Sequence, residues 1–240
     1  MANDNRPPRS RWLIASVIVL VLLVLTAVVG AVLRDGTAPA TPPAAASTPA
    51  AGPAVTSTGT PGCAQVAPPS SRVPTRPPAD LRLEVENRAL IPVSDTFGPA
   101  QRSGRVWTCF AHTPMGAVMA AQTISTRRVA SPDRVQVGEQ QLVHNRGRAV
   151  FLAAVRARSG DLGASPGTFV QPAGFAVVSY TGDTAVVSSA SRASDGTLRA
   201  ATLTVLWTED TWKLQLLPDG SDTPEVRAIA TLEGYILWGL

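Results

Sequence analysis

The fold is decided by the stretch "TLRAATLTVLWTEDTWKLQLL" at residues 197–217. Apolar and polar side chains alternate along it with a period of two, which is the period of a β-strand. The short interruption "TED" at 208–210 separates two such runs and predicts a tight turn between antiparallel strands. Both faces of the first run are mainly uncharged, which predicts a curved sheet with helices on one side and partial cover on the other.

The same period of two extends upstream of this hairpin. Residues 174–182 and 184–194 alternate in the same way, and Asp195-Gly196 is a strong signal for a two-residue hairpin turn. We therefore expect an antiparallel meander of strands from residue 174 to residue 217. Much earlier in the chain, Ile91–Val93 and Arg105–Phe110 are expected to be short extended segments in a turn-rich region.

Between these regions the spacing of the apolar residues becomes helical. In residues 112–125, Thr113 is a suitable N-cap and Pro114 fits the first helical position, where no donor is needed. A second helix is expected behind the cap residue Ser131, and a third over 146–160. Helices followed by a meander indicate an α+β fold, with a bent sheet around the helices and a cone-shaped interior. The expected core-facing stripe of the third helix is Val150, Ala153, Ala154 and Ala157.

The N-terminal third of the chain predicts a membrane anchor and a spacer. Residues 12–33 contain no charge and would span about 33 Å as a helix, enough to cross a bilayer core. A cleaved signal peptide is the alternative, but its apolar region is usually shorter. Arginines before the span place the N-terminus in the cytoplasm. We predict a single-pass protein of the cell membrane, with a cytoplasmic tail at 1–11, a transmembrane helix at 12–33, a disordered Pro/Ala/Thr-rich linker at 34–80 and an extracytoplasmic domain at 81–240.

Cys63 and Cys109 are the only cysteines, and both fall on the predicted external side. An even number of cysteines in an oxidising compartment predicts a disulfide bond. This bond would close a loop of about 46 residues and stabilise the domain by about 4 kcal/mol. Two free thiols and a catalytic Cys109 are the alternatives that the sequence leaves open.

Few residues in the chain are suited to catalysis or to binding a metal ion or cofactor. The sequence contains no P-loop and no HExxH pair, and the glycine-rich "GDLGASPG" at 160–167 lacks the strand–turn–helix context of a GxSxG nucleophile elbow. His112 precedes a helix start without a visible acidic partner, so a capping or packing role is expected, and His144 is the only other histidine. A Ser/His/Asp arrangement that assembles in space stays open. We predict no enzyme activity, no cofactor, and no catalytic, cofactor-binding or metal-binding residue.

Charge is segregated along the predicted domain. Arginines dominate the helical stretch, and acidic residues dominate the strand half. The ordinary interpretation is a solvated surface, and the functional one is a dipolar surface that pairs with copies of itself or with a complementary partner. Direct binding of nucleic acid is not expected, because the domain is close to neutral overall. The candidate interaction residues are Arg127, Arg128, Arg134, Arg146, Arg148, Arg156 and Arg158.

Two segments resemble a known family. "FGPAQRSGRVWTCFAHTPMGAVMAA" (97–121) resembles a segment of small bitopic membrane proteins carried on integrative and conjugative elements of high-GC Gram-positive bacteria. "TLTVLWTEDTWKLQLLPDG" (202–220) resembles their closing hairpin, in which Trp207 and Trp212 flank a turn. The resemblance implies an external domain similar to the scaffold subunit of type IV secretion systems. That subunit has a nuclear-transport-factor-like (cystatin-like) fold and no catalytic residues.

The leading hypothesis is a non-enzymatic scaffold or assembly component of a conjugative transfer or secretion apparatus. Its partners would be the membrane, other subunits of the apparatus and further copies of itself. The alternative is a ligand-binding or lipid-transport accessory protein of the mammalian-cell-entry-associated type, which would need a continuous apolar pocket inside the cone. A third hypothesis, an external enzyme, would need His112 or His144 facing that pocket beside an acid.

Overall fold

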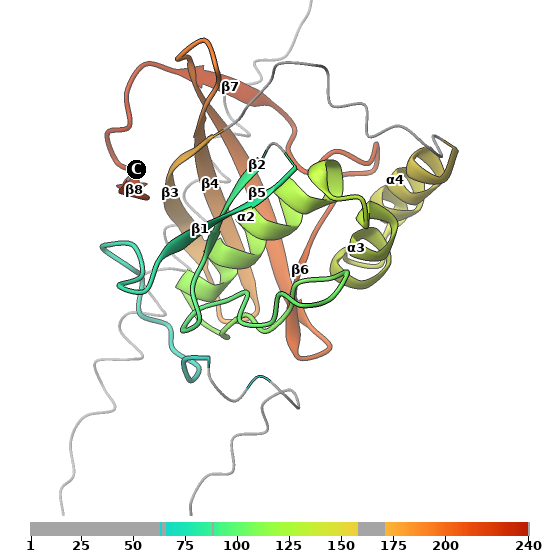
Figure 1. Ribbon diagram of the computed structural model, residues 1–240, viewed down its shortest axis with the longest axis horizontal. Helices are drawn as coiled ribbons and strands as arrows, with labels where there is room; N and C mark the ends of the chain where they lie inside the picture. The colour runs from blue at the N-terminus through green and yellow to red at the C-terminus, as the bar shows by residue number, and fades with distance from the viewer. Residues whose placement is uncertain (1–62, 64–65, 88, 158–170, 240) are drawn as a thin grey trace, which may run out of the picture. The chain divides into compact units, whose positions relative to one another are not determined.

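The computed structural model describes residues 63, 66–87, 89–157 and 171–239, and within them the chain has an α+β fold (Figure 1). A first hairpin is followed by helices and then by antiparallel strands, so the expected fold class is confirmed at this level. The helices are α2 (Pro114–Ala130), α3 (Arg134–Gln141) and α4 (Arg146–Ala157), and the strands are β1 (Arg82–Glu86), β2 (Ala89–Val93), β3 (Gln171–Tyr180), β4 (Thr184–Arg192), β5 (Leu198–Thr208), β6 (Thr211–Leu214), β7 (Val226–Ile229) and β8 (Ile236–Leu237).

The main sheet is antiparallel, with the strand order β6-β5-β4-β3-β8 and with β7 paired to β5 beside this path. Strands β3 to β6 are the predicted meander, and β4 pairs with β5 over its whole length. Glu209 and Asp210 form the turn between β5 and β6, with positive φ angles of 53° and 56°. This left-handed conformation is the one that two-residue hairpin turns require. Thr208 and Thr211 pair directly beside the turn, and Trp207 and Trp212 form the next pair.

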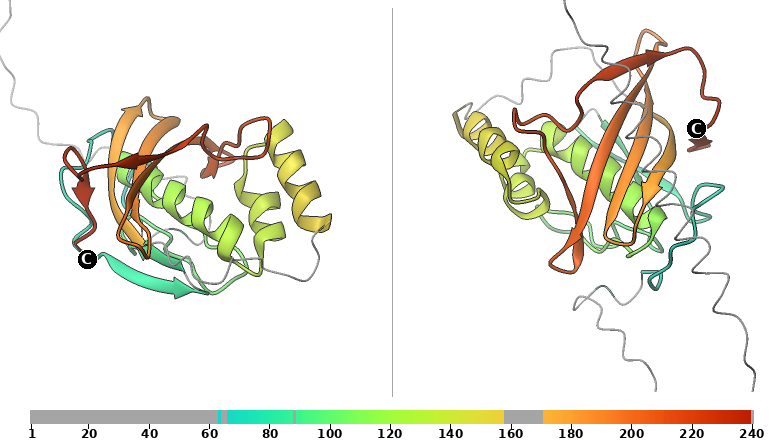
Figure 2. Two further views of the ribbon diagram at one scale, coloured as in Figure 1. Left: turned by 90° about the horizontal axis from the view of Figure 1, so that it is seen from above. Right: turned by 180° about the vertical axis from the view of Figure 1, so that it is seen from behind.

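Helix α2 lies between the main sheet and the separate β1–β2 hairpin (Figure 2). Its start is the predicted one: the Thr113 hydroxyl accepts a hydrogen bond from the Gly116 N–H at 3.0 Å, and Pro114 opens the helix. Gly116 is required here because a Cβ at this position would collide with the carbonyl oxygen of Ala111. The cap and the glycine together let the chain enter α2 directly from the preceding loop.

The β1–β2 hairpin was only partly predicted. Strand β2 includes the expected extended segment Ile91–Val93, but β1 was not predicted. The Arg105–Phe110 segment forms no named strand and contributes one isolated bridge, between Gln101 and Thr108. The hairpin is held by burial of β2, in which Ile91 and Val93 are fully buried and cluster with Trp107.

One cluster of buried side chains joins α2 to the inner face of the main sheet. Trp212 is fully buried, and its indole N–H donates to the carbonyl oxygen of Ala111 at 2.9 Å. The C-terminal segment also packs on the sheet, since the Trp238 ring lies 4.5 Å from that of Phe175, centre to centre. On the opposite face Tyr235 contacts Ser188, with 2.8 Å between the hydroxyl oxygens. The sheet therefore has the expected helical side and a partial cover on its other side.

The predicted core-facing stripe of the third helix is wrong. In α4 the buried residues are Gly147, Phe151 and Leu152. Val150 is exposed, and so are the three alanines of the predicted stripe. Burying Phe151 and Leu152 removes more apolar surface from water than burying small side chains, so the larger residues turn toward the protein.

The second helix begins later than predicted, at Arg134. Ser131 instead ends α2, and its backbone N–H donates to the carbonyl oxygen of Arg127 at 3.0 Å. Its hydroxyl accepts a hydrogen bond from the Asp133 N–H at 3.1 Å, and Asp133 takes the N-cap position of α3. The physical reason is that α2 continues to Ala130, so Ser131 becomes the junction between two helices.

The described fold begins before the predicted boundary at residues 80 and 81. The Ala67 N–H donates to the carbonyl oxygen of Thr96 at 2.7 Å, and the Ser70 N–H donates to that of His112 at 3.2 Å. The segment before the predicted boundary is therefore attached to the folded part at Ala67 and Ser70. The predicted transmembrane helix at 12–33 falls outside the described residues. Within the described ranges, no helix combines the length and the apolar character that a membrane span needs.

Candidate interaction surface

Arg127 does not belong to an exposed surface, contrary to expectation. Only 2% of its side chain is exposed, and it donates to the two carboxylate oxygens of Glu86 at 2.6 and 2.9 Å. Its guanidinium carbon also lies 4.5 Å from the ring centre of Trp107. This arrangement attaches the tip of the β1–β2 hairpin to α2, so the role of Arg127 is structural.

Arg128 is also neutralised within the chain. Its guanidinium lies 2.6 Å from a carboxylate oxygen of Asp222, and Ser125 bonds to the same carboxylate. The guanidinium carbon lies 5.7 Å from the ring centre of Phe151. Helical arginines are thus paired with acids from the flanking strand regions, and the charge separation along the sequence is lost at these positions in space.

Three of the remaining arginines of the predicted set, Arg146, Arg148 and Arg156, lie on α4. Arg146 is exposed at its first position, whereas Arg134 begins α3 and Arg158 falls outside the described residues. Arg148 and Arg156 line a groove of about 540 Å³ along α4. The structure therefore keeps only part of the predicted surface together, and that part is this groove. The groove is lined by His144, Asn145, Arg148, Ala149, Leu152, Ala153 and Arg156.

The polar side of the α4 groove is held by internal hydrogen bonds. Asn145 caps α4, because its side-chain oxygen accepts from the Arg148 N–H at 2.9 Å while its amide nitrogen donates to the Leu216 carbonyl oxygen at 2.8 Å. Arg148 donates to the carbonyl oxygens of Gly138 and Glu139 at 3.0 and 2.7 Å, and lies 2.8 Å from Nδ1 of His144. Since arginine can only donate, Nδ1 accepts this bond. The two arginines of the groove are therefore both engaged within the chain, Arg148 by these carbonyl oxygens and Arg156 by the Glu139 carboxylate at 2.5 Å.

His112 does have an acidic neighbour, which corrects the sequence-based expectation. Its Nε2 lies 3.1 Å from Asp183 and 3.1 Å from the carbonyl oxygen of Gly182, both in the β3–β4 turn. The imidazole stacks on Trp207 with the ring centres 4.0 Å apart and the planes within 7°. The expected packing role is therefore present, and it ties the segment before α2 to the β3–β4 turn. Asp183 lies far away in the sequence, so no local motif indicates this contact.

The two cysteines form a disulfide bond between Cys63 and Cys109, with their Cα atoms 5.2 Å apart. Both sulfur atoms are thus used in a covalent link, and neither is a thiol nucleophile in this state. The bond attaches the first described residue of the chain to the loop immediately before α2.

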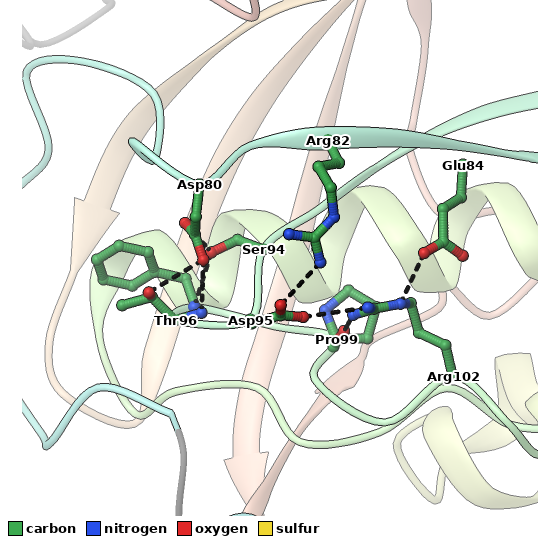
Figure 3. Close-up of polar contacts among 9 residues, drawn as sticks. Asp80, Arg82, Glu84, Ser94, Asp95, Thr96, Pro99 and Arg102 are labelled. Carbon is green, nitrogen blue, oxygen red and sulfur yellow. Dashed lines mark hydrogen bonds and ion pairs between the residues drawn. The ribbon is translucent and has the colours of Figure 1, made fainter.

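A polar cluster that was not predicted from the sequence lies where the N-terminal segment meets the β1–β2 hairpin (Figure 3). The Asp80 carboxylate accepts hydrogen bonds from the Ser94 hydroxyl at 2.7 Å and from the N–H and hydroxyl of Thr96 at 2.9 and 3.0 Å. Burial raises the pKa of Asp80, but these hydrogen bonds outweigh it, and the pKa lies below the ordinary 3.8. The turn-forming sequence "SDT" at 94–96 was the available signal.

Ion pairs continue this cluster along β1. Asp95 accepts from Arg82 at 2.8 Å and from Arg102 at 3.1 Å, and Arg102 also lies 2.7 Å from Glu84. The hydrogen bond from Arg82, followed by that from Arg102, lowers the pKa of Asp95. The same bond raises the pKa of Arg82. The cluster therefore joins the N-terminal segment, β1 and the loop after β2 by charged contacts.

No group of histidine, cysteine and acidic side chains in the described part of the chain has the geometry of a metal site. Comparison with known proteins gives one family. Residues 44–237 match the model of a family described as "Domain of unknown function (DUF8175)". Neither a curated protein nor a solved structure matches the chain.

Proposed function

The chain belongs to the DUF8175 family, and from that premise we propose that it is a membrane-anchored, non-enzymatic scaffold of a conjugative transfer or secretion apparatus. In this proposal residues 12–33 cross the cell membrane once, with the N-terminus in the cytoplasm. The following Pro/Ala/Thr-rich segment is the spacer that carries the folded domain outside the cell. The domain contacts other subunits of the apparatus and further copies of itself.

The observation that carries this proposal is the way the N-terminal segment is attached to the domain. Its attachments are the Cys63–Cys109 disulfide, the hydrogen bonds from Ala67 and Ser70, and the Asp80 carboxylate that binds two residues after β2. A segment held at several points fixes the place at which the chain leaves the domain toward its proposed anchor. A defined position is what a scaffold needs, and a freely turning enzyme or carrier does not need it.

We further propose that the domain has the nuclear-transport-factor-like (cystatin-like) fold of the secretion scaffold subunit. The features in favour are the meander β3 to β6 and its packing against the long helix α2. Features outside that simple plan are the β1–β2 hairpin before α2 and the C-terminal segment over the outer face of the sheet.

The described interior favours the scaffold over the ligand-binding alternative. That alternative needs an apolar cavity between α2 and the sheet. Met119, Phe175 and Trp212 are fully buried there and belong to one packed cluster. The α4 groove is lined by Arg148 and Arg156 as well as by apolar residues, so it is not the continuous apolar pocket that this alternative needs.

The proposal is tested by transfer frequency in donor cells that lack the protein. We expect transfer to fall sharply, to be restored by the full chain, and to stay low with a chain that lacks residues 1–33. A full chain with Val73→Ala, an exposed position in the N-terminal segment, is the matched control and should restore transfer. Normal transfer in the deletion strain would reject the proposal. Protease treatment of intact cells tests the topology separately, and a protected domain would contradict it.

A further inference from the structure

Strand β1 exposes an apolar residue on its outer face, whereas an edge strand ordinarily places its apolar residues toward the protein. Its charged residues share one face and are ion-paired within the chain, Arg82 with Asp95, Glu84 with Arg102 and Glu86 with Arg127, and of these pairs only Glu86–Arg127 is largely buried. Leu83 and Val85 alternate with them and therefore face the opposite side. Val85 is 66% exposed, the largest exposed fraction among the exposed large apolar side chains of the described residues. An exposed apolar side chain on a short strand is unfavourable in water, and contact with another strand beside β1 would reduce that exposure.

The outer edge of β1 also offers unpaired backbone groups. In the part of the chain that the structure describes, β1 pairs only with β2. Glu86 pairs with Ala89 beside the two-residue connection, so this pair exchanges hydrogen bonds. Hydrogen-bonded and non-hydrogen-bonded pairs alternate along the hairpin from this point, so Leu83 and Pro92 form a non-hydrogen-bonded pair. This position suits Pro92, because proline has no N–H to donate. The N–H and C=O groups of Leu83 and Val85 therefore point away from β2.

The sequence of β1, "RLEVE", is complementary to itself when two copies run antiparallel. With a two-fold axis at Glu84, Leu83 lies opposite Val85 of the second copy, and their outward backbone groups form four hydrogen bonds. In the same register Arg82 lies opposite Glu86 of the second copy, which places opposite charges together twice. The two Glu84 side chains also lie opposite one another, but each is already paired with its own Arg102 at 2.7 Å.

Neighbouring registers are less favourable. A shift by two residues in one direction places Glu84 opposite Glu86, which opposes like charges. A shift in the other direction requires the N–H of Leu81, which already donates to the carbonyl oxygen of Pro78 at 3.2 Å. The charges and the free backbone groups thus select one register.

We propose that β1 is a homodimerisation edge, and that two copies of the chain pair their β1 strands antiparallel about Glu84 to form a four-stranded sheet β2-β1-β1-β2. The dimer would be one of the contacts that the proposed scaffold makes with copies of itself. Only this biological purpose of the dimer rests on the proposed function. The pairing itself is judged by self-association, whereas the scaffold role is judged by transfer frequency, so failure of one is distinguishable from failure of the other.

The register is tested by cysteine cross-linking of the full chain in detergent micelles. Glu84→Cys places the new thiols opposite each other, where Cα atoms of a non-hydrogen-bonded pair are about 4.5 Å apart, within disulfide range. Val85→Cys is the matched control, because its more exposed thiol faces Leu83 and lies about 7–8 Å diagonally from its own copy. We expect at least about ten times more disulfide-linked dimer for Glu84→Cys than for Val85→Cys. Equal yields, or no dimer from Glu84→Cys, would overturn the proposal.

A second variant tests the edge without a thiol and without touching the Glu84–Arg102 pair. Val85→Lys adds a charge to the pairing edge, which is the usual way that natural edge strands avoid pairing. We expect its dimer dissociation constant, measured by sedimentation, to rise at least about tenfold, a free-energy change of about 1.4 kcal/mol. Val178→Lys, at a 62% exposed position of β3, is the control and should dimerise like the wild type. A monomeric wild-type chain, or a Val85→Lys chain that dimerises normally, would refute the pairing.

Discussion

Replacing Glu86 by alanine tests whether the buried Arg127 charge depends on its partner. The change removes both charged hydrogen bonds, of 2.6 and 2.9 Å, from a guanidinium whose side chain is 2% exposed. What remains around Arg127 is the Ser131 hydroxyl at 3.3 Å and the face of Trp107. Neither contact supplies a counter-charge, so the positive charge would be buried without compensation.

Breaking one partner of a buried pair costs about 3–5 kcal/mol. For a domain of this size each kcal/mol lowers Tm by about 2–4 °C, so Glu86→Ala should lower Tm by about 6–20 °C. Tryptophan fluorescence of the full chain in detergent is a suitable measurement, since Trp107 lies at the site. The double variant Arg127→Met with Glu86→Leu should recover most of the loss, because well-packed apolar residues can replace a buried ion pair.

Asp95→Ala is the control for this experiment. Asp95 also pairs with arginines, but its side chain is 54% exposed, and water screens the interaction. We expect no measurable change in Tm. If Glu86→Ala shifts Tm no more than Asp95→Ala does, the argument that burial makes the Arg127 contact important is wrong.

Three further predictions concern the start of α2, the polar cluster and the disulfide. Gly116→Ala should lower the free energy of unfolding by about 1–3 kcal/mol through overpacking, whereas Gly104→Ala, whose Cβ would have its nearest neighbour at 3.6 Å, should leave Tm unchanged. The lowered pKa of Asp80 means that its ionised form stabilises the fold above its ordinary pKa of 3.8. That contribution is lost as the pH falls through the lowered value, so Asp80→Asn should be less stable than wild type near neutrality and equal to it in strong acid. A constant difference at all pH values would contradict this. Reducing Cys63–Cys109, which are separated by 46 residues, should cost about 4 kcal/mol, and a Tm insensitive to reductant would contradict the model of loop closure.

The elements that could be predicted are those whose signal is local. The Thr113–Pro114 start of α2 and the alternation along β5 each depend on neighbouring residues alone. Strand β1 escaped prediction because Val85 is exposed while Glu86 is largely buried against Arg127, which reverses the ordinary placement of apolar and charged residues. The buried face of α4 was assigned wrongly because alanines were given the same weight as Phe151 and Leu152.

The candidate surface shows the same limit. The arginines were visible in the sequence, but the acids that neutralise them were not linked to them by any spacing. Arg127 and Glu86 are 41 residues apart, and Arg128 and Asp222 are 94 residues apart. The contact between His112 and Asp183 likewise joins residues that are 71 positions apart (183 − 112).

By itself the sequence determined that helices precede an antiparallel meander, the turn between β5 and β6, and the presence of two cysteines that could pair. Hydrogen-bonding period, capping and turn chemistry act over a few residues, so a single chain displays them. Only the tertiary structure decided which arginines stay at the surface, which face of β1 meets water, and where the N-terminal segment is attached. These outcomes depend on which distant segments approach one another. Burial determines how strongly two charges interact, and it does so only once those segments are packed together.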